Sequence, residues 1–160
     1  MRPAASFTPT DSTKLVRSMS EAIRFHFDVD GDNFTSAGQA SVQMKKNLRQ
    51  IGVPPEIIRK LAIAMYEGEI NMVIHASGGS ADVLVYEDRI EIILADRGPG
   101  IPDVELAMSE GYSTAPDKIR SLGFGAGMGL PNMKRYTDDM KIDTVIGEGT
   151  TITMTVNLTD

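Results

Sequence analysis

Four glycines alternate with other residues between Gly123 and Gly129, and a helix-compatible segment, 130–136, follows directly. Glycine has no Cβ, so its backbone can adopt positive φ angles and its amide can lie close to a bound group. A helix N-terminus adds unpaired N–H groups and a favourable dipole, and together these features suit an anion such as phosphate. A flexible surface loop is the alternative interpretation of such a cluster taken alone.

Two well-known phosphate-binding loops do not fit this segment. A P-loop requires Gly-x-x-x-x-Gly-Lys-Ser/Thr, and the chain contains no Gly-Lys pair. The dinucleotide fingerprint requires Gly-x-Gly-x-x-Gly directly after a buried strand. Here the glycines alternate strictly, and the preceding segment 112–121 is polar and contains Pro116. The sequence therefore predicts a phosphate site of a different architecture.

Composition narrows the class of protein. A chain of 160 residues, 41% hydrophobic and 24% charged, fits one domain with a core of its own. We expect residues 1–20 to be a flexible leader and residues 21–160 to form that domain. The net charge of −6 argues against general affinity for nucleic acid or anionic membranes, and no apolar run approaches the roughly 20 residues of a membrane span. The lack of cysteine favours a cytoplasmic location.

Hydrophobic periodicity predicts an α+β fold. Strand patterns cover 22–28, 81–87, 89–96, 140–146 and 151–158, and helical patterns cover 36–51, 56–75 and 130–136. Thr35 or Ser36 is expected to cap the first helix, and Ser77–Ser80 is expected to be a loop. These elements predict a two-layer α/β sandwich, in which a mixed, mostly antiparallel sheet carries its helices on one face.

The helix predicted over 56–75 places Glu67 and Asn71 on one face, one turn apart, among apolar residues. Such a pair can simply bond to itself or cap a loop. The functional alternative is that Asn71 supplies an oxygen ligand to Mg²⁺ while Glu67 acts as a general base. Glu69 falls on another face of the helix and is expected to be solvated.

Further candidate residues follow the later strands. Asp96 ends a strand and precedes Gly98 and Gly100, an arrangement that suits either a turn or recognition of an exocyclic amine by the carboxylate. Thr150, at the start of the last strand, can reach the same place. The long connection 102–122 is typical of a functional lid that contacts phosphates.

Four segments in order resemble the asparagine box and the three glycine boxes of the GHKL (Bergerat-fold) ATPases, which include histidine kinases and gyrase. The segments are Glu67-x-x-x-Asn71, Asp96-x-Gly98-x-Gly100, Gly125-x-Gly127-x-Gly129-Leu130 and Gly147-x-Gly149-Thr150. Within this superfamily the chain is most similar to the small bacterial anti-sigma-factor serine/threonine kinases and the related switch kinases. A histidine kinase is disfavoured because the chain lacks a helical hairpin with a phospho-accepting histidine.

The resemblance implies ATP and Mg²⁺ as cofactors, with Glu67 as the catalytic base and Asn71 as the metal ligand. It implies nucleotide binding by Asn71, Asp96, Gly98, Gly100, Ile101, Gly125, Gly127, Met128, Gly129, Leu130 and Thr150. Ser113 and Thr114, in the connection 102–122, are further candidates to contact phosphates, and an ordinary surface position is the alternative for both.

The resemblance also implies a substrate. The expected activity is phosphorylation of a serine or threonine on a STAS-domain anti-sigma-factor antagonist, and some members of the family also bind a sigma factor. A homodimer is compatible with this resemblance. The alternative is an ATP-binding regulatory module that sequesters a sigma factor or regulator with negligible phosphotransfer; retention of Glu67 favours the kinase.

Overall fold

The computed structural model describes residues 22–32, 34–109 and 129–159. The strands are β1 (Ile23–Asp30), β2 (Gly78–Val85), β3 (Arg89–Asp96), β4 (Asp139–Val145) and β5 (Gly149–Asn157). The helices are α2 (Gln39–Gln50), α3 (Pro55–Ala76), the short α4 (Val104–Ala107) and α6 (Gly129–Arg135), with a 3-10 turn at Phe34–Ser36.

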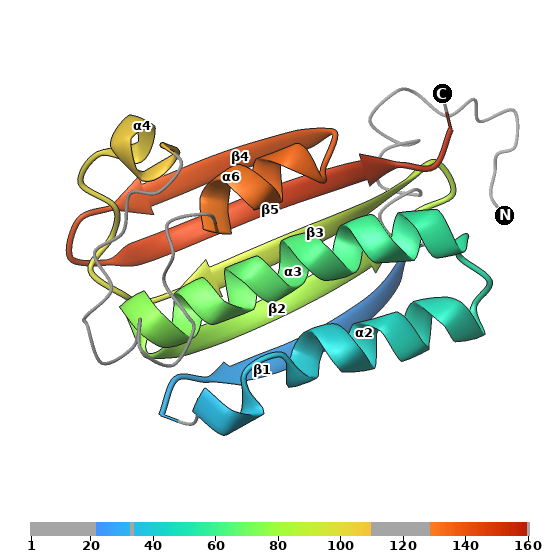
Figure 1. Cartoon of the computed structure of the whole chain (residues 1–160), viewed down its shortest axis with the longest axis horizontal. Coiled ribbons are helices and arrows are strands. Elements are labelled where there is room, and N and C mark those ends of the chain that lie inside the picture. Colours follow the sequence, from blue (N-terminus) through green and yellow to red (C-terminus); the bar gives the residue numbers. More distant parts are fainter. Residues whose placement is uncertain (1–21, 33, 110–128, 160) are drawn as a thin grey trace, which may run out of the picture.

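The five strands form one sheet in the order β1-β2-β3-β5-β4, and every neighbouring pair is antiparallel. Helices α2, α3 and α6 lie side by side on one face of the sheet, with α3 in the middle (Figure 1). This arrangement confirms the predicted two-layer α+β fold with helices on one face, but the described sheet is entirely antiparallel rather than mixed. Among the described residues, no helix combines the length and the hydrophobicity that crossing a bilayer requires.

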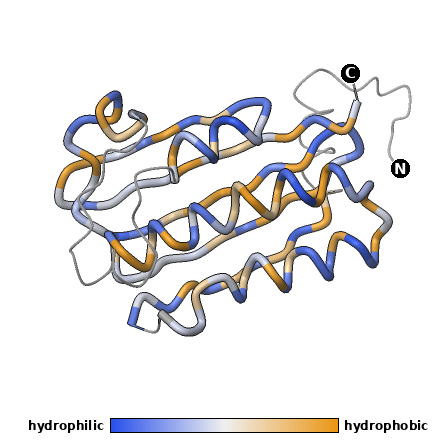
Figure 2. Tube along the Cα trace, in the orientation of Figure 1, coloured by the Kyte–Doolittle hydropathy of each residue, from blue (hydrophilic) through white to orange (hydrophobic). Residues whose placement is uncertain are grey.

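The core lies between the sheet and the helices. Alternate residues of each strand point inward, so that Val83, Ile92 and Met154 stand next to one another across β2, β3 and β5. Met44 of α2 and Met65 of α3 are fully buried on the opposite side of this core. Figure 2 shows the resulting alternation of hydrophobic and hydrophilic residues along both helices. Each fully buried side chain of this size contributes roughly 1.5–3 kcal/mol to folding.

The start of α2 differs from the prediction. The helix begins at Gln39, after the 3-10 turn, and Gly38 precedes it with φ +97°. The N-cap position is therefore Gly38 and not Thr35 or Ser36. Its first N–H groups instead donate to the carboxylate of Glu69 on α3, which is 3% exposed rather than solvated. The prediction for Glu69 was wrong because this face of α3 packs against α2 and not against water.

The predicted loop Ser77–Ser80 was also wrong, since β2 already begins at Gly78. Ser77 alone makes the turn out of α3, with φ 59°. Gly79 pairs with β1 and β3 at once, and a Cβ on it would lie 2.3 Å from the carbonyl oxygen of Ala95. Glycine is therefore needed here for close strand packing. The segment was predicted as a loop because glycine and serine are typical of loops, but here they form the start of a strand.

Candidate functional site

One end of the candidate site is built where α3 meets α6. Glu67 and Asn71 are partly buried on the face of α3 that turns towards α6. The side-chain amide of Asn132, on α6, donates to Oε2 of Glu67 over 2.8 Å. Gly129 opens α6 against Asn71, and a Cβ on this glycine would lie 3.0 Å from Oδ1 of Asn71. The structure thus brings Glu67, Asn71 and the last glycine of the glycine-rich segment together.

The other end of the site is organised around Asp96, the last residue of β3. Its Oδ1 accepts hydrogen bonds from the backbone N–H of Gly98, over 2.9 Å, and of Thr150, over 3.2 Å. Both of these bonds use the same oxygen, so within the part of the chain that the structure describes Oδ2 can accept from a further donor. Thr150 is buried, at 6% exposed, so the N–H group that it donates to the Asp96 carboxylate comes from the protein interior. The predicted proximity of Asp96 and Thr150 is confirmed.

A second layer of contacts joins this end of the site to β4. The hydroxyls of Thr144 and Thr150 lie 2.9 Å apart, and the backbone N–H of Ile101 donates to Thr144 over 2.8 Å. The loop after Asp96 is shaped by glycines: Gly100 has φ +86°, and a Cβ on Gly98 would lie 2.6 Å from the Cβ of Ala76. These glycines therefore allow the loop to pack tightly against α3 and the β4–β5 turn.

The C-terminal end of α3 places His75 within the electrostatic reach of Asp96. Burial lowers the pKa of His75, and the negative charge of Asp96 raises it in part. The imidazole keeps part of its surface in solvent, but enough protein surrounds it for burial to dominate. The neutral form is favoured at neutral pH.

The donor set fits a nucleotide with a magnesium ion better than a protein-held metal. Among the described residues, no three acidic or histidine side chains converge on a point. Magnesium bound together with substrate phosphates usually takes only one or two protein ligands, and the Asn71 amide oxygen suits that role. The spare oxygen of Asp96 suits an exocyclic amine, because an ionised carboxylate can only accept hydrogen bonds.

Several predicted residues lie outside the described part of the chain. They are Ser113, Thr114, Gly125, Gly127 and Met128, and most of the predicted lid falls with them. Leu130 is buried in the core at the start of α6. Sequence reasoning missed Asn132 and Thr144. The signals available for them were a polar residue in the first turn after the glycines and a threonine paired across the turn from Thr150.

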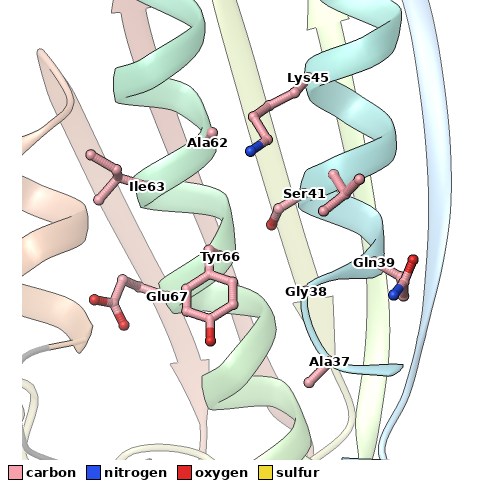
Figure 3. Close-up of a pocket in the computed structure, with 10 residues that line it drawn as sticks. Ala37, Gly38, Gln39, Ser41, Lys45, Ala62, Ile63, Tyr66 and Glu67 are labelled. Atoms are coloured by element: carbon pink, nitrogen blue, oxygen red, sulfur yellow. The ribbon is translucent and has the colours of Figure 1, made fainter. Parts of the chain in front are cut away.

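A shallow groove of about 430 Å³ lies between the start of α2 and the outer surface of α3 (Figure 3). In this view the Tyr66 ring stands between Glu67 on one side and Ser41 and Lys45 on the other. Apolar groups of Ala62 and Ile63 contribute to the lining. Glu67 lies at the edge of the groove, and its carboxylate stands on the side of Tyr66 away from Ser41 and Lys45 (Figure 3). Asp96 is not among the residues that line the groove.

Comparisons with known proteins agree with these observations. Residues 33–156 match the family model of the histidine kinase-like ATPase domain. The serine/threonine-protein kinase RsbT of Bacillus subtilis is 32% identical over 118 residues, which cover 71% of this chain and 83% of the relative. The anti-sigma F factor of Clostridium novyi is 32% identical over 121 residues, which cover 72% of this chain and 81% of the relative.

Solved structures show the same fold at low sequence identity. The RsbU and RsbW domains of a Mycobacterium tuberculosis protein align with a TM-score of 0.59 at 18% identity, over 84% of this chain and 32% of that one. The SiaB–SiaC complex of Pseudomonas aeruginosa aligns with a TM-score of 0.52 at 8% identity, over 92% of this chain and 95% of that one. The chain therefore belongs to the histidine kinase-like (GHKL) ATPase family, in the branch of bacterial serine/threonine kinases and anti-sigma factors, and is an enzyme of the GHKL kinase type.

Proposed function

We propose that this protein is a Mg²⁺–ATP-dependent serine/threonine kinase that phosphorylates a STAS-domain anti-sigma-factor antagonist. The observation that carries the proposal is the position of Glu67 and Asn71, which lie one turn apart on α3. Both contact the first turn of α6, the helix that begins at the last glycine of the glycine-rich segment. The relationship to RsbT, named a serine/threonine-protein kinase, supports this activity. Partner switching between an antagonist and a sigma factor is supported by the relationship to anti-sigma F factors.

The residues divide into two roles in this proposal. Asp96 accepts a hydrogen bond from the adenine amine through Oδ2 and is held in place by Gly98 and Thr150. Asn71 would hold Mg²⁺ through its amide oxygen, and the bound ion would neutralise phosphate charge. Ile101 and Gly100 border the adenine ring. Leu130 and Gly129 set the position of the first turn of α6 beside Asn71.

Glu67 takes the proton of the acceptor hydroxyl. The hydroxyl oxygen bonds to the γ-phosphorus while the bond from that phosphorus to the ADP oxygen breaks, so the products are a phosphoserine or phosphothreonine and ADP. Oε2 of Glu67 accepts from Asn132, and among the described residues Oε1 is the oxygen that remains for the acceptor hydroxyl.

Phosphotransfer to a purified STAS-domain antagonist, encoded by the same genome, tests the proposal. Glu67→Gln should reduce transfer at least a hundredfold and leave nucleotide affinity unchanged, because the amide cannot accept the proton. Glu148→Gln, which changes an exposed glutamate in the β4–β5 turn, is the matched control and should retain full activity. Full transfer by Glu67→Gln would refute the assignment of the base.

Thermal unfolding with nucleotide tests the binding half of the proposal separately. ATP and Mg²⁺ at about a hundred times the dissociation constant should add roughly 2.7 kcal/mol to the unfolding free energy. Asp96→Asn keeps an oxygen for Gly98 and Thr150 but removes the charge, so it should fold and lose most of this gain. Asn71→Ala should lose the dependence on Mg²⁺. If ATP stabilises the wild type but no acceptor is phosphorylated, the protein is an ATP-binding regulatory module instead.

A further inference from the structure

Asn132 makes a contact that none of the four sequence boxes accounts for. Its Nδ2 lies 2.8 Å from Oε2 of Glu67, across 65 residues of sequence, in a partly buried position. A carboxylate has no hydrogen to donate, so the group that faces it must be the amide nitrogen and not the amide oxygen. The other inward residues of α6, Leu130 and Met133, are buried in the core. Asn132 is therefore set on a helix that the core holds firmly.

The spacing along the two helices matches. Glu67 and Asn71 are four residues apart on α3, and Asn132 and Gly129 are three residues apart on α6, so each pair shares one face of its helix. Gly129 lies against Asn71, and Asn132 bonds to Glu67. One face of α6 thus contacts both residues at once, and the position of α6 fixes where the Glu67 carboxylate points.

We propose that Asn132 is a positioning residue for Glu67, an inference that rests on the proposed kinase function. By holding Oε2, the amide removes rotational freedom from a long side chain and leaves Oε1 directed to the acceptor hydroxyl. A base held in one orientation meets the acceptor in a reactive geometry more often, and misplacement of a reacting group by about 1 Å can cost about a hundredfold in rate. Asn132 itself touches neither nucleotide nor acceptor in this account.

The variants Asn132→Ala and Asn132→Asp test this role. Alanine removes the donor, and aspartate keeps the shape but replaces the donor with an acceptor. Both should lower kcat for phosphotransfer about tenfold to a hundredfold, while KM for ATP and the nucleotide-dependent thermal shift stay within error of wild type. Lys134→Ala, at an exposed position of the same helix, is the matched control and should leave kcat unchanged.

A double-mutant cycle separates positioning from a general loss of fold. In a Glu67→Gln background the base is already absent, so adding Asn132→Ala should lower the residual rate by less than twofold. If wild type transfers phosphate and Glu67→Gln does not, the proposed function stands. In that case, a kcat of the Asn132 variants that equals or exceeds the wild-type value overturns the positioning role of Asn132 but not the kinase proposal. A further large loss in the Glu67→Gln background also overturns it, since Asn132 then acts through another group. A wild type without transfer overturns the proposed function and this inference together.

Discussion

Replacing Glu69 with alanine should lower the unfolding free energy of the domain by about 3–4 kcal/mol. This side chain is 3% exposed. Its Oε2 accepts from the N–H groups of Gly38 (2.8 Å) and Ala40 (3.1 Å), and its Oε1 accepts from the N–H (3.2 Å) and hydroxyl (2.8 Å) of Ser41. The carboxylate therefore supplies the N-terminal cap of α2 from a different helix, and it also interacts favourably with the helix dipole.

The magnitude follows from these four contacts. A hydrogen bond to a charged group contributes about 1.5–3 kcal/mol net, and loss of a helix cap costs about 0.5–2 kcal/mol. The full sum overstates the loss, because α2 begins beside the open groove and water can reach some of the freed N–H groups. A net loss of about 3–4 kcal/mol remains, which for a domain of this size corresponds to a fall in Tm of roughly 10 °C.

Urea and thermal unfolding followed by circular dichroism measure this loss. Glu69→Gln should fall between wild type and alanine, because the amide keeps one acceptor but turns an NH₂ group towards backbone donors. Ser41→Ala should cost about 1 kcal/mol, since it removes one of the four donors. Glu87→Ala, at an exposed turn, should stay within about 0.5 kcal/mol of wild type. If Glu69→Ala costs no more than Glu87→Ala, the carboxylate does not cap α2 in solution.

Other predictions concern the histidines and two glycines. Hydrogen bonding to Asp82 raises the pKa of His26, so the stabilisation from this pair should be complete below about pH 6.5 and be lost as pH rises through the folded pKa; NMR titration of Asp82→Asn should show a lower pKa. Burial lowers the pKa of His75, so acidification below about pH 6.5 should destabilise the fold through this group, and its resonance should titrate at lower pH than that of His26. Gly149→Ala should cost about 2 kcal/mol more than Gly147→Ala in urea unfolding. Both glycines have positive φ angles, +139° and +82°, but a Cβ at Gly149 would lie 2.1 Å from the last carbonyl oxygen of β3, whereas a Cβ at Gly147 meets no atom within 4 Å. Equal losses would show that this close contact does not destabilise the variant.

The periodicity of the sequence was sufficient to predict most elements. The β2–β3 hairpin, the long α3 and the final β4–β5 pair lie within a few residues of their predicted bounds. In each of these segments the burial pattern follows the local sequence, because strands with one covered face alternate strictly. The contact between Asp96 and Thr150 was predictable for the same reason: one residue ends a strand and the other begins its neighbour in the sheet.

Residues between helices were harder to predict. A helical wheel places Glu69 away from Glu67 and Asn71, and that face was interpreted as solvent-exposed. However, α3 is the middle helix of the layer, with α2 on one flank and α6 on the other. A sequence shows that a helix has several faces, but it does not show how many neighbours cover them. Asn132 was missed for the same reason, since its partner lies across a helix interface.

The middle position of α3 allows stability and chemistry to be separated within one short segment. Glu69 bonds to the first turn of α2, whereas Glu67 bonds to α6 on the other flank of α3. These two glutamates are two residues apart, so they point to nearly opposite sides of the helix. Loss of the buried carboxylate should therefore lower Tm with little change in kcat at temperatures where the variant is still folded. Loss of the partly exposed carboxylate should lower kcat with little change in Tm. A Glu69 variant that is fully folded but as inactive as Glu67→Gln would show that α2 and the site do not act independently.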